Sequence, residues 1–141
     1  MSDQMVKLIA AGVLLAHGLG HGGALGALAW IQLRPGTDTG AWHAARSWLA
    51  PSLSGETATT IAGAFWVASM VGFVIVAMSF WGVLLPEGVW RPLGVVSAVV
   101  SFVGIVLFFG NWPLFNTLAA LGVNIAVLVA VLWLRLPSAA L

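Results

Sequence analysis

The sequence has 141 residues, of which 61% are hydrophobic and only 6% charged, and its mean hydropathy is +1.07. Soluble globular domains carry about 25% charged residues, so this composition excludes a soluble domain and indicates an integral membrane protein. A formal net charge of +1 leaves no basic surface for nucleic acid. The absence of cysteine excludes disulfides, thiolate metal sites and cysteine nucleophiles.

Long uncharged stretches predict four membrane-spanning helices. Residues 8–33, 57–86 and 92–134 contain no Asp, Glu, Lys or Arg, and one span needs roughly 20 apolar residues. Turn signals rich in Pro and Gly follow the first two stretches, and Gly110-Asn111-Trp112-Pro113 divides the third. The expected fold class is therefore an all-α transmembrane four-helix bundle in a single domain, 1–141, with spans near residues 5–33, 57–85, 92–109 and 114–136.

The positions of the tryptophans support this division. Trp prefers the membrane–water interface, where its ring is buried and its N–H stays hydrated. Of the eight tryptophans, seven fall at expected ends of spans, and only Trp66 lies within a helix. One side of the membrane would hold Trp30, Trp42, Trp48 and Trp112, and the other side would hold Trp81, Trp90 and Trp133.

The basic residues give a small orientation signal. Lys7, Arg91 and Arg135 lie on the side of the two termini, and Arg34 and Arg46 lie on the opposite side. Cytoplasmic segments carry an excess of Lys and Arg, so this distribution favours cytoplasmic termini. The expected location is the bacterial inner membrane, with membrane lipid as a partner.

Residues 34–56 form the only long connection between spans. Apolar side chains recur in it at helical spacing, at Trp42, Ala45, Trp48 and Leu49. This spacing predicts a short amphipathic helix that lies in the membrane interface between the first and second spans. A solvated loop anchored by its two tryptophans is the alternative.

The main candidate site is a histidine pair in the first span. His17 and His21 are four residues apart and therefore lie on one face of a helix, near the middle of the span. Ionisable groups at that depth are costly and usually face the bundle interior. We expect the pair to form a polar core or ligand-binding centre with Asn124 in the fourth span and with hydroxyl groups of the third span, at Ser97 and Ser101. The second span offers two further hydroxyl groups as partners, at Ser69 and Ser79.

Three roles for the histidine pair stay open at this stage. The imidazoles could join helices through hydrogen bonds, or they could serve as a proton relay or a pocket for a polar ligand. They could also bind haem or a transition metal, because imidazole nitrogen binds Zn, Cu and Fe. A third metal ligand is lacking at that depth, since His43 and Glu56 lie near the interface.

Small residues run beside the histidines. Gly18, Gly22 and Gly26 form a doubled small-xxx-small pattern, which lets another helix or a flat ligand approach the backbone closely. Packing within the protomer is the first expectation and dimerisation the second. No carboxylate lies near the histidine pair, so no catalytic triad or carboxylate pair can be assembled, and we assign no catalytic residues.

The sequence resembles small bacterial four-helix membrane proteins with an HG-x-x-H first helix. The resemblance rests on His17-Gly18-Leu19-Gly20-His21, Trp90-Arg91-Pro92-Leu93, Leu107-Phe108-Phe109 and Asn124. Residues 15–19 are also similar to the first helix of DoxX-like proteins, which usually carry Lys where this chain has His21. Neither resemblance implies an established activity.

The expected function is therefore non-enzymatic. The protein would bind a lipid-like or apolar ligand, or a partner helix, through a bundle interior lined by His and Gly. One alternative is a metal- or haem-binding redox protein that uses His17 and His21. Another is an accessory subunit of a larger membrane complex or a homo-oligomer.

Overall fold

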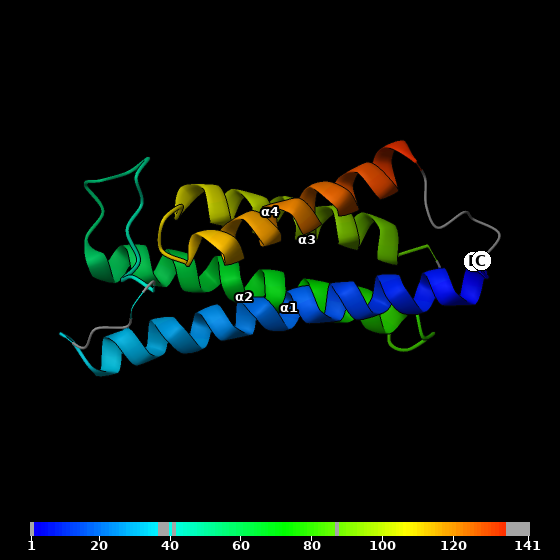
Figure 1. The fold of residues 1–141 in the computed structure, drawn as a ribbon, viewed down its shortest axis with the longest axis horizontal. Coiled ribbons are helices and arrows are strands. Elements are labelled where there is room, and N and C mark those ends of the chain that lie inside the picture. Colours follow the sequence, from blue (N-terminus) through cyan, green and yellow to red (C-terminus); the bar gives the residue numbers. More distant parts are fainter. Residues whose placement is uncertain (1, 37–39, 41, 87, 135–141) are drawn as a thin grey trace.

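The fold is an all-α bundle. The computed structural model describes residues 2–36, 40, 42–86 and 88–134, and no strand occurs among them. Its helices are α1 (Asp3–Leu33), α2 (Gly55–Ser79), α3 (Trp90–Leu107) and α4 (Leu114–Leu128), and α4 continues into a short π-helix, η1 (Val129–Trp133) (Figure 1). Each of the four helical segments is long and apolar enough to cross a membrane. The predicted fold class is confirmed, and the protein is an integral membrane protein.

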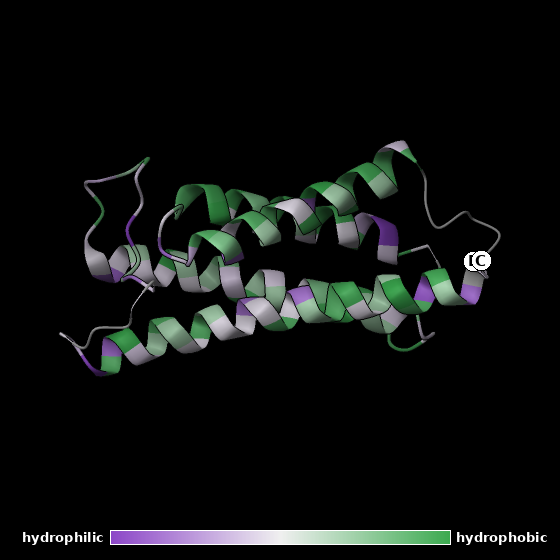
Figure 2. Ribbon diagram, viewed as in Figure 1, coloured by the Kyte–Doolittle hydropathy of each residue, from purple (hydrophilic) through white to green (hydrophobic). Residues whose placement is uncertain are grey.

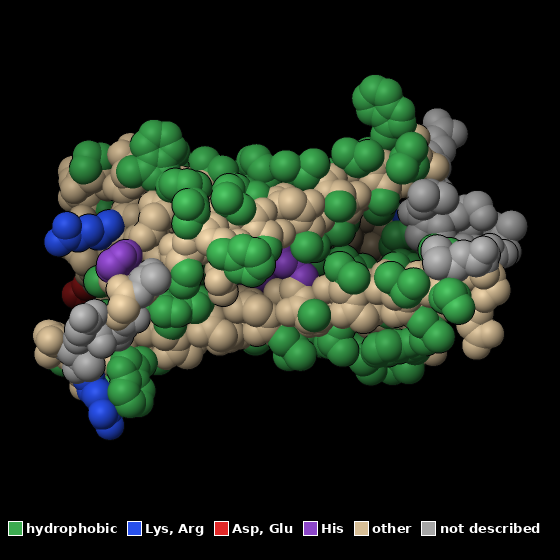
Figure 3. Space-filling view, in the orientation of Figure 1, with side chains coloured by type: hydrophobic (Ala, Val, Ile, Leu, Met, Phe, Trp, Pro, Cys, Tyr) green, Lys and Arg blue, Asp and Glu red, His purple; other side chains and the backbone are tan. Residues whose placement is uncertain are grey.

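The outer surface of the bundle is suited to lipid. Large apolar side chains are exposed on all four helices, for example Leu19, Val67, Val96 and Leu118. Figure 2 shows apolar residues along the whole length of the helices, and Figure 3 shows Lys and Arg only near the ends of the molecule. Helices that are apolar on every side are typical of a membrane environment.

The helices pack in chain order. α1 packs against α2, α2 against α3, and α3 against α4. α1 and α4 are the first and last helices of this series, and they have little direct backbone contact with each other. The seam between α1 and α4 is therefore the most open part of the bundle.

Glycines allow the close helix contacts. A Cβ at Gly18 would lie 3.2 Å from Met70 O and 3.2 Å from Phe73 Cβ, both in α2, and a Cβ at Gly22 would lie 3.0 Å from Met70 Sδ. Gly26 has no such neighbour within 4 Å. Two of the three glycines of the small-residue pattern thus face α2 of the same chain.

The contact between α2 and α3 depends on Gly104. A Cβ there would lie 2.8 Å from Phe65 Cβ, and that atom is attached directly to the α2 backbone and cannot rotate away. We expect Gly104→Ala to lower the free energy of unfolding by about 1–3 kcal/mol through overpacking. Thermal unfolding in detergent measures the loss. Gly63→Ala is the control, because it meets nothing within 4 Å and adds a better helix former; an equal loss in both variants would contradict the packing argument.

The predicted amphipathic helix between the first two spans is wrong. Residues 42–54 contain no helix. Ala45 and Ser47 are buried on either side of exposed Arg46, which is the alternation of an extended segment. This segment is held by the α3–α4 turn, because His43 N donates to Asn111 O at 3.0 Å. Of the apolar side chains in the predicted helix, Ala45 is buried, whereas Trp48 and Leu49 are exposed, so they do not form one buried helical face.

The observed helix ends refine the predicted spans. α2 begins where Ser54 Oγ accepts a hydrogen bond from Thr57 N at 3.2 Å, a common N-cap arrangement. It ends at Ser79, before the expected residue 85, and the chain then turns through left-handed backbone at Gly82 and Leu84. Arg135, which contributed to the orientation argument, and the last predicted residues of the fourth span lie outside the described residues.

Candidate functional site

A chain of hydrogen bonds joins three helices in the middle of the bundle. His17 Nε2 in α1 donates to Asn124 Oδ1 in α4 at 3.0 Å. Asn124 Nδ2 donates to Ser101 Oγ in α3 at 2.8 Å, and Ser101 Oγ is hydrogen-bonded to His21 Nε2 at 2.9 Å. We call His17, Asn124, Ser101 and His21 the polar chain.

The Asn124 amide fixes the donor in two of the three hydrogen bonds of the polar chain. Because Asn124 Oδ1 can only accept, the proton of the His17 ring that takes part is on Nε2. Ser101 Oγ accepts from Asn124 Nδ2, and the donor of its bond with His21 Nε2 depends on the tautomer of His21. His21 Nδ1 is buried without a partner among the described residues. The polar chain therefore ends at one buried ring nitrogen.

Aromatic rings enclose the two imidazoles. His21 lies 5.6 Å from Trp66 and 5.5 Å from Trp112, measured between ring centroids. The His17 ring meets Phe73 edge to face at 4.6 Å and lies 4.9 Å from the His21 ring. Trp66 and Phe73 are fully buried. The aromatic rings hold both imidazoles in place and keep water away from His21.

A groove runs along the seam between α1 and α4. Its first part is a cavity of about 340 Å³, lined by His17 and His21 from α1, Asn116 and Ala119 from α4, and Trp112 from the α3–α4 turn. Its second part is an apolar cavity of about 240 Å³. The two cavities share the lining residues Val13 and Val123, so we treat them as one feature, the α1/α4 groove. Figure 3 shows histidine side chains at mid-length on this face of the molecule.

The structure brings four of the predicted polar residues together and leaves others apart. His17, His21, Asn124 and Ser101 form the polar chain, whereas Ser97 is buried against Gly72 of α2 and makes no hydrogen bond with the chain. The second-span hydroxyls also stay outside it: Ser79 Oγ donates to Val76 O, and Ser69 Oγ is buried without a partner among the described residues.

Sequence reasoning missed the aromatic part of the site. The sequence predicts Trp112 at the membrane interface, because it stands in a turn at the end of a span. In the structure it packs inward, 4.6 Å from Trp66. The sequence did contain one signal for this aromatic cluster: Trp66 is the one tryptophan within a predicted span. A buried indole at that position needs large side chains packed around it.

The donor set does not favour a metal at the histidine pair. Nε2 of each imidazole is already committed to a hydrogen bond, with Asn124 and with Ser101. In the part of the chain that the structure describes, no group of three His, Cys, Asp or Glu side chains lies close enough to hold an ion. His43 and Glu56 are exposed residues of the loop and the start of α2, away from the pair.

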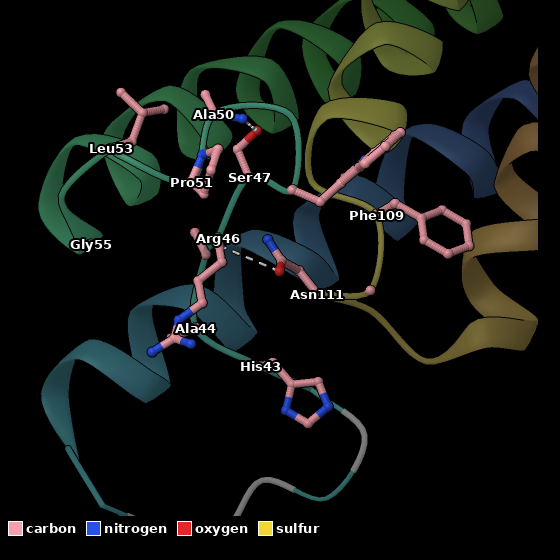
Figure 4. A pocket seen from close by; sticks show the side chains of 13 residues that line it. His43, Ala44, Arg46, Ser47, Ala50, Pro51, Leu53, Gly55, Phe109 and Asn111 are labelled. Carbon is pink, nitrogen blue, oxygen red and sulfur yellow. Dashed lines mark hydrogen bonds between the residues drawn. The ribbon is translucent and has the colours of Figure 1, made fainter.

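A second pocket lies at the loop end of the bundle. It has a volume of about 860 Å³ and is lined by the extended segment, including His43, Arg46 and Trp48, and by Asn111 of the α3–α4 turn (Figure 4). Asn111 Oδ1 accepts from Arg46 N at 3.4 Å, and its Nδ2 is buried without a partner among the described residues. This pocket is separate from the polar chain and is formed by loops.

Comparisons with protein-family models, with curated proteins and with solved structures found no match to this chain.

Proposed function

We propose that the protein binds one lipid-like amphiphile in the α1/α4 groove and carries out no chemistry on it. The observation that carries the proposal is the groove itself, which lies along the most open seam of the bundle and reaches the polar chain at mid-length. A lipid could enter sideways from the membrane through such a seam, without crossing a polar surface.

The size and lining of the groove support this proposal. Small-molecule sites have volumes of roughly 300–1,000 Å³ and are mostly apolar, with a few polar groups that orient the ligand. The first cavity, about 340 Å³, falls in this range. His17 and Asn116 are its orienting polar groups, and the polar chain fixes the His17 ring through Asn124.

Other roles are less well supported by the contacts. Gly18 and Gly22 already face α2, so this part of the glycine pattern is used within the chain rather than for a partner helix. A metal at the histidine pair would have to use the two Nδ1 atoms, because both Nε2 atoms are hydrogen-bonded, and among the described residues no third His, Cys, Asp or Glu lies close enough to join them. Binding of an amphiphile in the groove needs no further ligand from the chain.

Filling the groove tests the proposal. Ala119 lines the groove and is exposed on α4, so we expect Ala119→Trp to displace a ligand and reduce lipid retained after gentle purification by at least about tenfold, a loss of about 1.4 kcal/mol in binding free energy. Native mass spectrometry measures the retained lipid. Ala68→Trp is the matched control, because Ala68 is exposed on α2 outside the groove; equal lipid retention in the two variants would reject the proposal.

A further inference from the structure

We infer that the amphiphile held in the α1/α4 groove has an uncharged head group, a hydroxyl or a carbonyl, and that its chain extends toward Phe80 and Trp90. This inference rests on the proposed function and specifies the chemical class of the ligand. It follows from three observations: the depth of His17, the charge of the lining and the shape of the second cavity.

His17, where the groove meets the polar chain, lies deep in the membrane-spanning region. α1 covers Asp3–Leu33, so His17 is one residue from its midpoint. At about 1.5 Å per residue, His17 is roughly 20 Å from either end of the helix. An ionised head group at that depth pays a large desolvation cost. Phospholipid head groups stay at the surface, whereas a neutral hydroxyl or carbonyl can reach this level.

The lining offers no charge to compensate an ionised ligand. No Asp, Glu, Lys or Arg is among the described residues that line either cavity. The groove instead offers neutral hydrogen-bonding groups: the amide of Asn116, the indole N–H of Trp112 and the second ring nitrogen of His17. None of these groups is used in a hydrogen bond within the described residues. Such groups match a hydroxyl or a carbonyl, which donates or accepts one or two hydrogen bonds.

The second cavity gives the ligand its direction. It begins at Val13 and Val123, which it shares with the first cavity, and continues between α1 and α4 to Phe80 and Trp90. Its lining is aliphatic and aromatic throughout. An alkyl or isoprenoid chain fits there, and a second polar head does not. The ligand therefore has one head, at the level of His17, and an apolar chain that runs toward the end of the bundle where α1 begins.

Three probes with the same chain and different heads test the inference. Delipidated full-length protein in detergent is titrated with octadecanol, octadecyl sulfate and octadecyltrimethylammonium, and bound probe is counted by native mass spectrometry. We expect one octadecanol per chain, with both charged probes at least about tenfold weaker. Ala119→Trp fills the first cavity and Ala126→Trp the second, and each is expected to weaken octadecanol binding at least about tenfold. Ala68→Trp is expected to leave it unchanged.

The outcomes separate this inference from the proposed function. If a charged probe binds as tightly as octadecanol and is displaced by Ala119→Trp, the groove binds amphiphiles but the neutral-head inference is wrong. If no probe binds, or if octadecanol binding is the same in Ala119→Trp, Ala126→Trp and Ala68→Trp, both the inference and the proposed function are rejected. Using two filling variants keeps the test valid if one of them fails to fold.

Discussion

Asn124→Leu is expected to lower the free energy of unfolding by about 2 kcal/mol. Asn124 is fully buried and connects His17 to Ser101 through two hydrogen bonds of the polar chain. Its loss removes two hydrogen bonds, each worth up to about 1–2 kcal/mol inside a membrane protein. It also leaves the His17 ring without its partner at a depth where water cannot replace it.

The measurement is thermal or denaturant-induced unfolding in detergent, with Asn116→Leu as the matched control. Asn116 is on the same helix but is exposed, and it makes no hydrogen bond among the described residues. The same substitution there is expected to change stability by less than about 0.5 kcal/mol. A double-mutant cycle with His17→Leu then isolates the coupling between the two side chains. Additive effects would show that the hydrogen bond between His17 and Asn124 contributes nothing to stability.

The spans could be predicted because the charges mark where the chain leaves the membrane. Only nine residues of this chain are charged, and the long gaps between them leave room for four apolar helices. The polar centre could also be anticipated, since imidazole and amide groups in mid-span must find partners. Asn124 was the one amide at that depth in the fourth span, and the structure pairs it with His17. Both predictions, the spans and the polar centre, follow from the apolar membrane environment. Neither requires knowledge of how the helices pack.

The choice between Ser97 and Ser101 could not be predicted. Both hydroxyls are on the same face of α3, one turn apart, and both are buried. Only Ser101 bonds to Asn124. The rotation and axial position of α3 in the bundle are set by close contacts such as that of Gly104 with Phe65 of α2. The single sequence carries no direct signal for such shifts between helices.

The loop between the first two spans shows a different limit. Its apolar spacing fits a helix, but hydrogen bonds to the end of α3 and to the α3–α4 turn hold it extended. Trp48 Nε1 donates to Val106 O at 2.6 Å, and Asn111 holds the backbone at His43 and Arg46. These partners are about 60 residues away in the sequence. A local pattern cannot report them, and so tertiary contacts overrode the local preference.

Trp66→Ala is expected to destabilise the bundle by about 3 kcal/mol. Trp66 is 1% exposed and contacts the rings of His21, Phe108 and Trp112. Truncation of a buried Trp costs about 3–5 kcal/mol in soluble proteins. The lower end of that range applies here, because the unfolded reference state in lipid or detergent is also apolar, and the loss is mainly one of packing contacts.

The same variant is expected to expose His21 to water. The cavity left by the indole would lie beside the stacked face of His21, whose Nδ1 is buried without a partner among the described residues. Water bound there would satisfy that atom, so hydrogen exchange of the His21 ring proton, followed by NMR, should become faster. Trp30→Ala is the control: Trp30 is 46% exposed at the end of α1, and its loss should leave both the stability and the exchange of the His21 proton nearly unchanged. If Trp66→Ala matched Trp30→Ala in both measurements, the aromatic rings around the imidazoles would not be what keeps the polar chain dry.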